Sequence, residues 1–229
     1  MDVAIVGGTG AEGFGLALRL GAAGHHVTIG SRDAARGVLA ATDAVERLGG
    51  SASIEGTANE EAVRGAEVVA VTVPFAGQAD IIRAIAPHLR AGQIVLDATS
   101  PLATAVGGRA WQVVRPWHGS AAEQARALLP EGVHIVAGFH TIAADALQDL
   151  DRPIDSDVLL AGSDRGSKET VGSLIDQIPG LRWVDCGDLS SARIIETLTA
   201  LLISINRTYK VKDSGFRIVG RDAWGSPGT

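Results

Sequence analysis

Short apolar runs alternate along the first part of the chain with segments whose apolar residues recur at helical spacing. The runs predict strands at 3–6, 26–30, 52–56, 67–73, 93–98 and 133–138. The spaced segments predict helices at 34–48, 59–66, 77–89 and 121–129, and an amphipathic helix that carries Leu16, Leu18 and Leu20. The run before Pro74 is almost entirely β-branched or small and apolar, which is typical of a parallel strand buried on both faces. This alternation predicts an α/β fold with a Rossmann-type, doubly wound parallel sheet.

The pattern changes after residue 142. Strands are predicted at 158–162 and 182–185, with a helix at 167–178 between them and a long apolar helix at 190–208. Residues 1–142 are therefore predicted to form a nucleotide-binding domain, and 143–229 a smaller α/β domain that completes a cleft for a second substrate. Apolar residues nearly surround the last helix between Ile194 and Ile205, which favours a core position or a homodimer interface. The segment 102–119 is predicted to be a loop whose role stays open.

A glycine-rich turn joins the first strand to the first helix. Gly8, Gly10 and Gly13 have the G-x-G-x-x-G spacing of dinucleotide-binding folds. A side chain at Gly8 or Gly10 would block the turn or hold a pyrophosphate away from the backbone, and Gly13 allows close helix packing. The helix N-terminus supplies free N–H groups and about half a positive charge. The predicted phosphate-binding residues are Gly8, Thr9, Gly10, Ala11, Glu12 and Gly13.

The end of the second strand indicates which nucleotide binds. An NAD-specific fold usually places an acidic residue there to bind the ribose hydroxyls, but this chain has Gly30-Ser31-Arg32. A hydroxyl and a guanidinium suit the 2′-phosphate of NADP, and Arg36 lies one helical turn further on. Asp33 is either the ribose acid or, as we favour, the cap of the helix that follows. The pattern favours NADP, bound in part by Ser31, Arg32 and Arg36.

Ligands of open parallel sheets lie beyond the carboxyl ends of the strands. Three segments are expected to meet there, namely 73–75, 98–101 and 139–142. They carry no recognisable hydrolase triad, metal-ligand spacing or lysine base, and no metal site is predicted. Hydride transfer needs only two aligned rings, because the cofactor carries the chemistry.

Composition limits the range of partners and compartments. The 229 residues include 20 basic and 26 acidic side chains, a net charge of -6, without a long basic cluster, so nucleic acid is not an expected partner. The single cysteine, Cys186, excludes an intrachain disulfide and fits the cytoplasm. The first apolar run lacks a basic leader and 198–205 is too short to span a membrane, so neither secretion nor membrane insertion is expected.

The ordered set of motifs resembles the F420-dependent NADP oxidoreductase family along nearly the whole chain. The motifs are Gly7-Gly8-Thr9-Gly10, Gly30-Ser31-Arg32, Val73-Pro74 and His140-Thr141-Ile142, joined by 119–123 and 185–193. The resemblance implies reversible hydride exchange between nicotinamide C4 and C5 of the deazaflavin coenzyme F420. It assigns Thr9, Ser31 and Arg32 to the 2′-phosphate end of NADP, and places Arg36 where the family has a basic residue.

By the same resemblance, the deazaflavin stacks on the nicotinamide in a cleft between the two domains. The residues expected beside the two rings are Val73, Pro74, Phe75, Ala98, His140, Thr141 and Ile142. His140 is the candidate catalytic residue, because its imidazole could donate to a pyrimidine carbonyl of the deazaflavin. The alternative is a buried histidine satisfied by the backbone. Trp111, Trp117 and His118 are interpreted as ordinary loop residues, the tryptophans as loop anchors.

Two departures from the family pattern keep other functions open. Members that bind the deazaflavin often have tryptophan and proline where this chain has Phe75 and Ala143. Phenylalanine loses an indole donor, and alanine frees a backbone that proline would fix. The alternatives are an NADPH-dependent reductase of a flavin, an imine or a ferric chelate, and a non-catalytic NADP-binding redox sensor.

Overall fold

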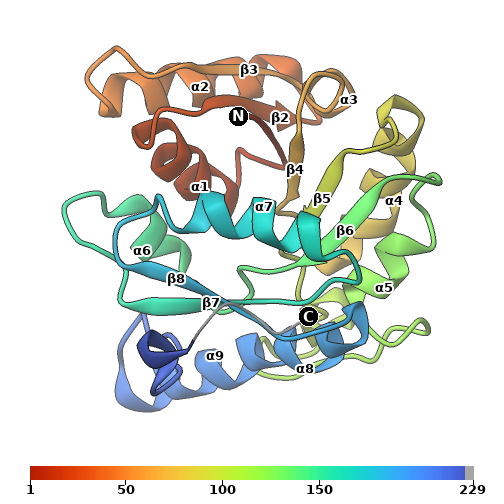
Figure 1. Cartoon of the computed structure of the whole chain (residues 1–229), viewed down its shortest axis with the longest axis vertical. Helices are drawn as coiled ribbons and strands as arrows, with labels where there is room; N and C mark the ends of the chain where they lie inside the picture. The colour runs from red at the N-terminus through yellow and green to blue at the C-terminus, as the bar shows by residue number, and fades with distance from the viewer. Residues whose placement is uncertain (225–229) are drawn as a thin grey trace.

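The computed structural model describes residues 1–224 and has a six-stranded parallel sheet at its centre (Figure 1). The sheet order is β3-β2-β1-β4-β5-β6. Its strands are β1 (Asp2–Val6), β2 (His26–Ser31), β3 (Ile54–Ala58), β4 (Val68–Val71), β5 (Ile94–Asp97) and β6 (His134–Ala137). The order reverses direction between β1 and β4, which places a ligand crevice at their carboxyl ends. The predicted fold class is confirmed.

Alternate residues of the central strands enter two separate cores. Val3 and Ile5 of β1 pack in one core, while Ala4 and Val6 pack in the other. Because successive strand side chains point to opposite faces, a strand buried on both sides must be apolar throughout. Helices α1 (Ala11–Ala22) and α2 (Ala34–Arg47) cover the first face. Helices α3 (Asn59–Ala62), α4 (Phe75–Ile85) and α5 (Ala121–Arg126) lie on the second.

The part after β6 continues the first core. Helix α6 (Ala144–Gln148) leads to β7 (Ser156–Leu160), α7 (Arg165–Ile175) and β8 (Leu181–Asp185), and β7 pairs with β8 in a parallel two-stranded sheet. Val158, Leu160 and Val171 join the core cluster that contains Ile5. A single antiparallel bridge, Ala137↔Ala161, links the two sheets. Among the described residues, no helix combines the length and apolar character needed to cross a bilayer.

A buried arginine holds the first helix against this later part. Arg19 donates from Nε to the Leu147 carbonyl at 3.0 Å and from Nη2 to the Ala146 carbonyl at 2.8 Å. The same group also reaches the Asp149 and Arg152 carbonyls. These bonds satisfy the buried guanidinium and the carbonyls at the end of α6. They fix the chain directly after the His140 segment.

The helices after β6 differ from the prediction in two places. Helix α6 was not predicted, because its five residues carry too little periodicity. The long helix predicted at 190–208 is wrong: the chain forms a 3₁₀ turn (Leu189–Ser191), α8 (Ala192–Ile195) and α9 (Leu198–Tyr209). At the break the Thr197 hydroxyl donates to the Ile194 carbonyl at 2.7 Å, which competes with the helical ladder.

The segment 102–119 is more ordered than the predicted loop. It contains a 3₁₀ turn (Ala103–Val106) and a bridge, Leu102↔Val113. The predicted C-terminal domain extends to residue 229, and its last five residues lie outside the described part of the chain.

Candidate functional site

The glycine turn is shaped by packing at two positions and is open at a third. A Cβ on Gly8 would lie 2.8 Å from the Ile5 carbonyl oxygen, and one on Gly13 would lie 2.4 Å from the Thr72 hydroxyl. Both positions therefore require glycine for the fold itself. A Cβ on Gly10 would meet only the Gly7 oxygen, at 3.4 Å, so the turn does not forbid a side chain there. The exposed Gly10 instead leaves the backbone accessible to a ligand.

A cavity of about 520 Å³ opens beside this turn. Its size is in the ordinary range for small-molecule sites. The predicted binding residues that line it are Thr9, Gly10, Ser31, Arg32, Arg36, Val73 and Pro74. The structure thus brings the first turn, the end of β2 and the end of β4 to one cavity.

Two arginines on this cavity lack acidic partners. Arg32 and Arg36 are exposed, and within residues 1–224 neither guanidinium forms an ion pair or a hydrogen bond. Asp33, the acidic residue between them, accepts from the Ala35 N–H at 3.0 Å and caps α2. The favoured role of Asp33 as a helix cap is confirmed.

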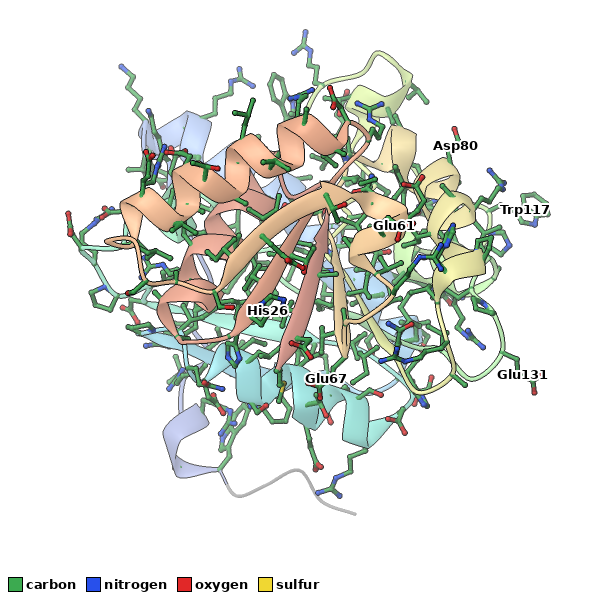
Figure 2. The ribbon with its side chains drawn as sticks, turned by 90° about the horizontal axis from the view of Figure 1, so that it is seen from above. His26, Glu61, Glu67, Asp80, Trp117 and Glu131 are labelled. Atoms are coloured by element: carbon green, nitrogen blue, oxygen red, sulfur yellow. The ribbon has the colours of Figure 1, made fainter. Side chains whose placement is uncertain are left out.

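Sequence reasoning missed Asn59, which also lines the cavity. This buried side chain accepts from the Gly7 N–H at 3.2 Å and so joins the start of α3 to the glycine turn. Its position in the sequence could have indicated this role, because Asn59 directly follows β3 and so lies at the same sheet edge as Ser31. Asp80 on α4 is another missed lining residue, and its side chain points outward in Figure 2.

A second cavity, of about 260 Å³, lies at the end of β6. His140, Thr141 and Ile142 line it, and so do residues from α9 and the chain beyond it that sequence reasoning missed: Thr199, Leu202, Ile203, Asn206, Lys212 and Ser214. The Thr199 hydroxyl donates to the His140 carbonyl at 2.7 Å and lies 2.6 Å from the Ser100 hydroxyl. These contacts hold α9 against the ends of β5 and β6.

The imidazole of His140 is buried and has free nitrogens. Its residue is 6% exposed, and neither Nδ1 nor Nε2 has a hydrogen-bond partner. Burial lowers the pKa of His140 to about 4. The Ala98 backbone, which lies nearby but makes no hydrogen bond of normal geometry with the ring, raises it only in part. The ring is therefore neutral near pH 7, with one donor and one acceptor to offer. Unsatisfied buried polar atoms cost about 1–3 kcal/mol each, so a ligand that pairs with them would bind favourably.

Six predicted residues line neither cavity: Gly8, Ala11, Glu12, Gly13, Phe75 and Ala98. Phe75 begins α4, next to the lining residue Pro74. Burial, and then the charge of Asp97, raises the pKa of Glu12 to about 8. Within the described residues, no group of three or more His, Cys, Asp or Glu side chains could hold a metal ion.

Buried polar side chains form a hydrogen-bond network at the carboxyl end of β5. Asp97 accepts from Gln78 Nε2 at 2.5 Å and from the Thr99 N–H at 2.9 Å, and Gln78 also donates to the Ala121 carbonyl. Glu196 accepts from the Ala121 and Ala122 N–H groups at 2.8 and 3.0 Å. Burial raises the pKa of Asp97 to about 6 and that of Glu196 to about 8. The network joins α4, α5 and α8.

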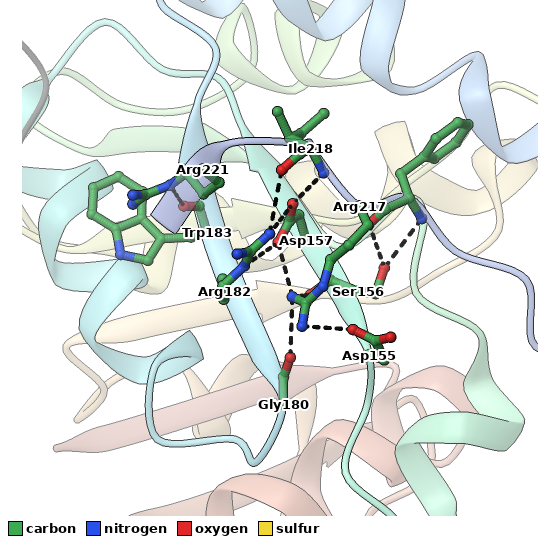
Figure 3. Close-up of polar contacts among 10 residues, drawn as sticks. Asp155, Ser156, Asp157, Gly180, Arg182, Trp183, Arg217, Ile218 and Arg221 are labelled. Carbon is green, nitrogen blue, oxygen red and sulfur yellow. Dashed lines mark hydrogen bonds and ion pairs between the residues drawn. The ribbon is translucent and has the colours of Figure 1, made fainter. Parts of the chain in front are cut away.

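The segment after α9 is anchored to β7 by a buried carboxylate (Figure 3). Asp157 is fully buried and accepts two bonds from Arg182, at 2.7 and 2.9 Å. It also accepts from Arg217 Nη1 at 3.1 Å and from the Ile218 N–H at 2.6 Å. Burial opposes ionisation of Asp157, but these hydrogen bonds outweigh it and hold its pKa below the ordinary value. The anchor fixes the chain that carries Lys212 and Ser214 into the second cavity.

The tryptophans of segment 102–119 differ from each other. Trp117 is 97% exposed and projects into solvent (Figure 2), so its interpretation as a loop anchor is wrong. Trp111 is partly buried and packs against two arginines.

Comparison with known proteins identifies the family. A family model described as "NADP oxidoreductase coenzyme F420-dependent" matches residues 2–101. The F420-dependent NADP reductase of Methanothermobacter thermautotrophicus is 41% identical over 220 residues, which cover 95% of this chain and 94% of the relative. The chain belongs to the F420-dependent NADP oxidoreductase family. The resemblance inferred from the motifs is thereby confirmed.

Two further proteins extend this similarity. The F420-dependent NADP reductase of Methanocaldococcus jannaschii is 41% identical over 221 residues, covering 95% of this chain and 98% of that protein. A solved structure from Arthrobacter sp. FB24, named as a candidate F420-dependent NADP reductase, superimposes with a TM-score of 0.82 at 25% identity. The superposition covers 96% of this chain and 99% of that one, so the family likeness includes the part after β6.

Proposed function

We propose that this protein transfers a hydride between NADP(H) and coenzyme F420. The observation that carries the proposal is the shared cavity of the glycine turn, Arg32 and Arg36, whose unpaired guanidinium groups suit a phosphorylated adenosine. The names of the whole-chain relatives support F420 as the second substrate. They do not favour a flavin, an imine, a ferric chelate or a sensor role.

The residues present fit both substrates. The open backbone at Gly10 and the N-terminus of α1 would bind the pyrophosphate, and Arg32, Arg36 and Ser31 the 2′-phosphate. The nicotinamide carries the exchanged hydride, and the deazaflavin accepts or returns it. Val73 and Pro74 would orient the nicotinamide, while the unpaired nitrogens of His140 would hold the second ring by a hydrogen bond. Thr141 and Ile142 would exclude water beside it.

The two parts of the chain would divide these tasks. Residues 1–142 would bind NADP, and 143–229 would complete the acceptor cavity. The α9 residues in that cavity support this division, since Thr199, Ile203 and Asn206 come from the later part.

The test is to mix the protein with NADPH and F420 and follow the deazaflavin absorbance. We expect it to bleach, and expect NADH to be much less effective. His140→Ala should lower kcat/KM for F420 by about tenfold or more, with the KM for NADPH nearly unchanged. Nucleotide binding with no bleaching between mildly acidic and mildly alkaline pH would contradict the proposal and favour the sensor alternative.

We further propose that the protein acts as a cytoplasmic homodimer. Ile194 and Leu201, which face outward from α8 and α9, are 67% and 48% exposed. Two large aliphatic residues on adjacent helices would be covered if a second copy packed there. The absence of an intrachain disulfide agrees with a reducing compartment.

A further inference from the structure

Two arginines from distant parts of the chain meet at one tryptophan. The guanidinium carbon of Arg207, on α9, lies 4.2 Å from the centre of the Trp111 ring, and that of Arg109 lies 5.2 Å from it. Both arginines are exposed, and in the described part of the chain neither guanidinium has an acidic partner or a hydrogen bond. The chain as a whole is acidic, with a net charge of -6. Two unpaired like charges beside one ring repel each other and make this part of the surface positive, which favours the binding of an anion.

Stacking leaves these groups free to bind. A guanidinium that lies over an aromatic face keeps its N–H donors at its edge, where they can form paired bonds to phosphate or carboxylate oxygens. The ring also limits the rotation of each side chain, so less conformational entropy is lost on binding. The arrangement is therefore suited to an anion with several oxygens.

The loop that carries Trp111 is held in place by backbone bonds. The Ala103 N–H donates to the Gln112 carbonyl at 2.8 Å, and the Val114 N–H to the Pro101 carbonyl at 2.8 Å. The Gln112 N–H closes a turn on the Arg109 carbonyl at 3.0 Å. These bonds order the loop that carries Arg109 and Trp111, and the Trp111 ring contacts Arg207 on α9.

Arg207 lies on α9, the helix whose earlier residues line the second cavity. Thr199, Ile203 and Asn206 line that cavity along α9, and Arg207 comes one turn after Ile203. The helix axis extends about 12 Å from Thr199, which touches the His140 segment, to Arg207. The charged side chains that line the cavity are the ammonium group of Lys212 and the carboxylate of Asp145. A ligand with its ring at His140 and an anionic extension would reach the arginines along this face.

We infer that Arg109 and Arg207, held on Trp111, form an anion subsite for the tail of coenzyme F420. This inference rests on the proposed function. F420 joins its deazaflavin through a ribityl chain to a phosphodiester and then to glutamate carboxylates. The ring would occupy the His140 cavity and the tail would follow α9 to the arginines. The subsite gives segment 102–119 a role in acceptor specificity.

The test compares acceptors that differ only in the tail. NADPH oxidation is measured with F420, with the deazaflavin riboside that lacks the tail, and with the same riboside carrying a 5′-phosphate. Arg207→Ala should raise the KM for F420 by about tenfold, and Arg109→Ala by somewhat less, because each loses charge-assisted bonds. The KM for the tail-less riboside should stay within about twofold, since that acceptor makes no such bond. If the arginine variants raise the KM for the riboside 5′-phosphate, the subsite binds the phosphate of the tail. If they raise the KM for F420 alone, it binds the carboxylates.

A control variant and the wild-type protein complete the test. Arg165→Ala removes an exposed arginine on α7 and should leave every KM unchanged. In the wild type, added salt should raise the KM for F420 far more than the KM for the tail-less riboside. Equal KM changes for tailed and tail-less acceptors, or no change with F420, would overturn the subsite while the proposed function stands. Failure of the wild type to reduce either acceptor would instead remove the proposed function and this inference together.

Discussion

The side chain at position 32 shows how one residue can decide cofactor choice. Arg32 lies at the end of β2 on the larger cavity and has no acidic partner in residues 1–224. A guanidinium without an internal partner keeps its full capacity for a phosphate. Asp33, which could have read the ribose instead, is occupied as the cap of α2.

Arg32→Ala should therefore weaken the binding of NADPH and leave the binding of NADH nearly unchanged. The expected loss is about 1.5–3 kcal/mol for NADPH, the usual value of a charge-assisted hydrogen bond. Calorimetric titration with both nucleotides measures it. Equal losses for the two would show that Arg32 does not bind the 2′-phosphate.

At the scale of elements, the C-terminal segment depends on one buried acid. Asp157 on β7 binds Arg182, Arg217 and the Ile218 N–H, and the anchored chain then lines the acceptor cavity. Its neighbour Asp155 binds the same Arg217 at 2.6 Å but is exposed. The two acids offer a matched comparison of a buried and a surface ion pair.

Asp157→Asn should lower the unfolding free energy by about 2–4 kcal/mol, because two guanidinium groups lose their buried counter-charge. Asp155→Asn should cost less than about 1 kcal/mol. Urea unfolding measures both. Asp157→Asn should also raise the KM for F420, since Lys212 and Ser214 lose their fixed position. Equal destabilisation by both substitutions would contradict this account of the anchor.

At the scale of the whole molecule, buried acids link stability to pH. Glu196 has a raised pKa of about 8, so the folded protein keeps its proton at pH values where the unfolded chain has lost it. A raised carboxyl pKa stabilises the fold fully below the ordinary value and loses that effect as pH rises to the folded value. Asp97 and Glu12 act in the same direction.

The unfolding free energy should consequently fall between about pH 5 and pH 8, by up to about 1.4 kcal/mol per pH unit for each group while the pH is below its folded pKa, which for Asp97 is about 6. Glu196→Gln should flatten this slope in urea titrations across that range. Glu131→Gln, at an exposed position without an ion pair in the described residues, should leave the slope unchanged. A wild-type slope of zero or of opposite sign would refute the role of these acids.

The proposed dimer is also a property of the whole molecule. Leu201→Arg should give a species of single-chain mass in sedimentation equilibrium, where the wild type gives twice that mass, because a charge would be buried in the interface. Leu39→Arg, at a 69% exposed leucine on α2, should leave the mass of the wild type unchanged. A wild type with single-chain mass would exclude the dimer.

Much of the fold could be predicted from local patterns. All eight strands were predicted, because the alternation and β-branched runs that indicate a strand involve only residues close together in the chain. The glycine spacing around Gly13 is local in the same way. The break between α8 and α9 could not, because it accompanies the Thr197 hydroxyl bond and the burial of Glu196 against α5, 74 or more residues away in sequence. Helix α6 has five residues, which is too short for a helical spacing of apolar residues to be recognised.

The candidate site divides in the same way. The sequence by itself determined the glycine turn, the arginines after β2 and the His140 segment, because each belongs to a local strand-to-loop pattern with a defined chemistry. Only the tertiary structure decided that Asn59 holds the turn, that α9 and Lys212 line the cavity of His140, and that Arg109 meets Arg207 on Trp111. The physical reason is that a side chain's partners across the fold depend on packing between elements, which no periodicity along the chain records.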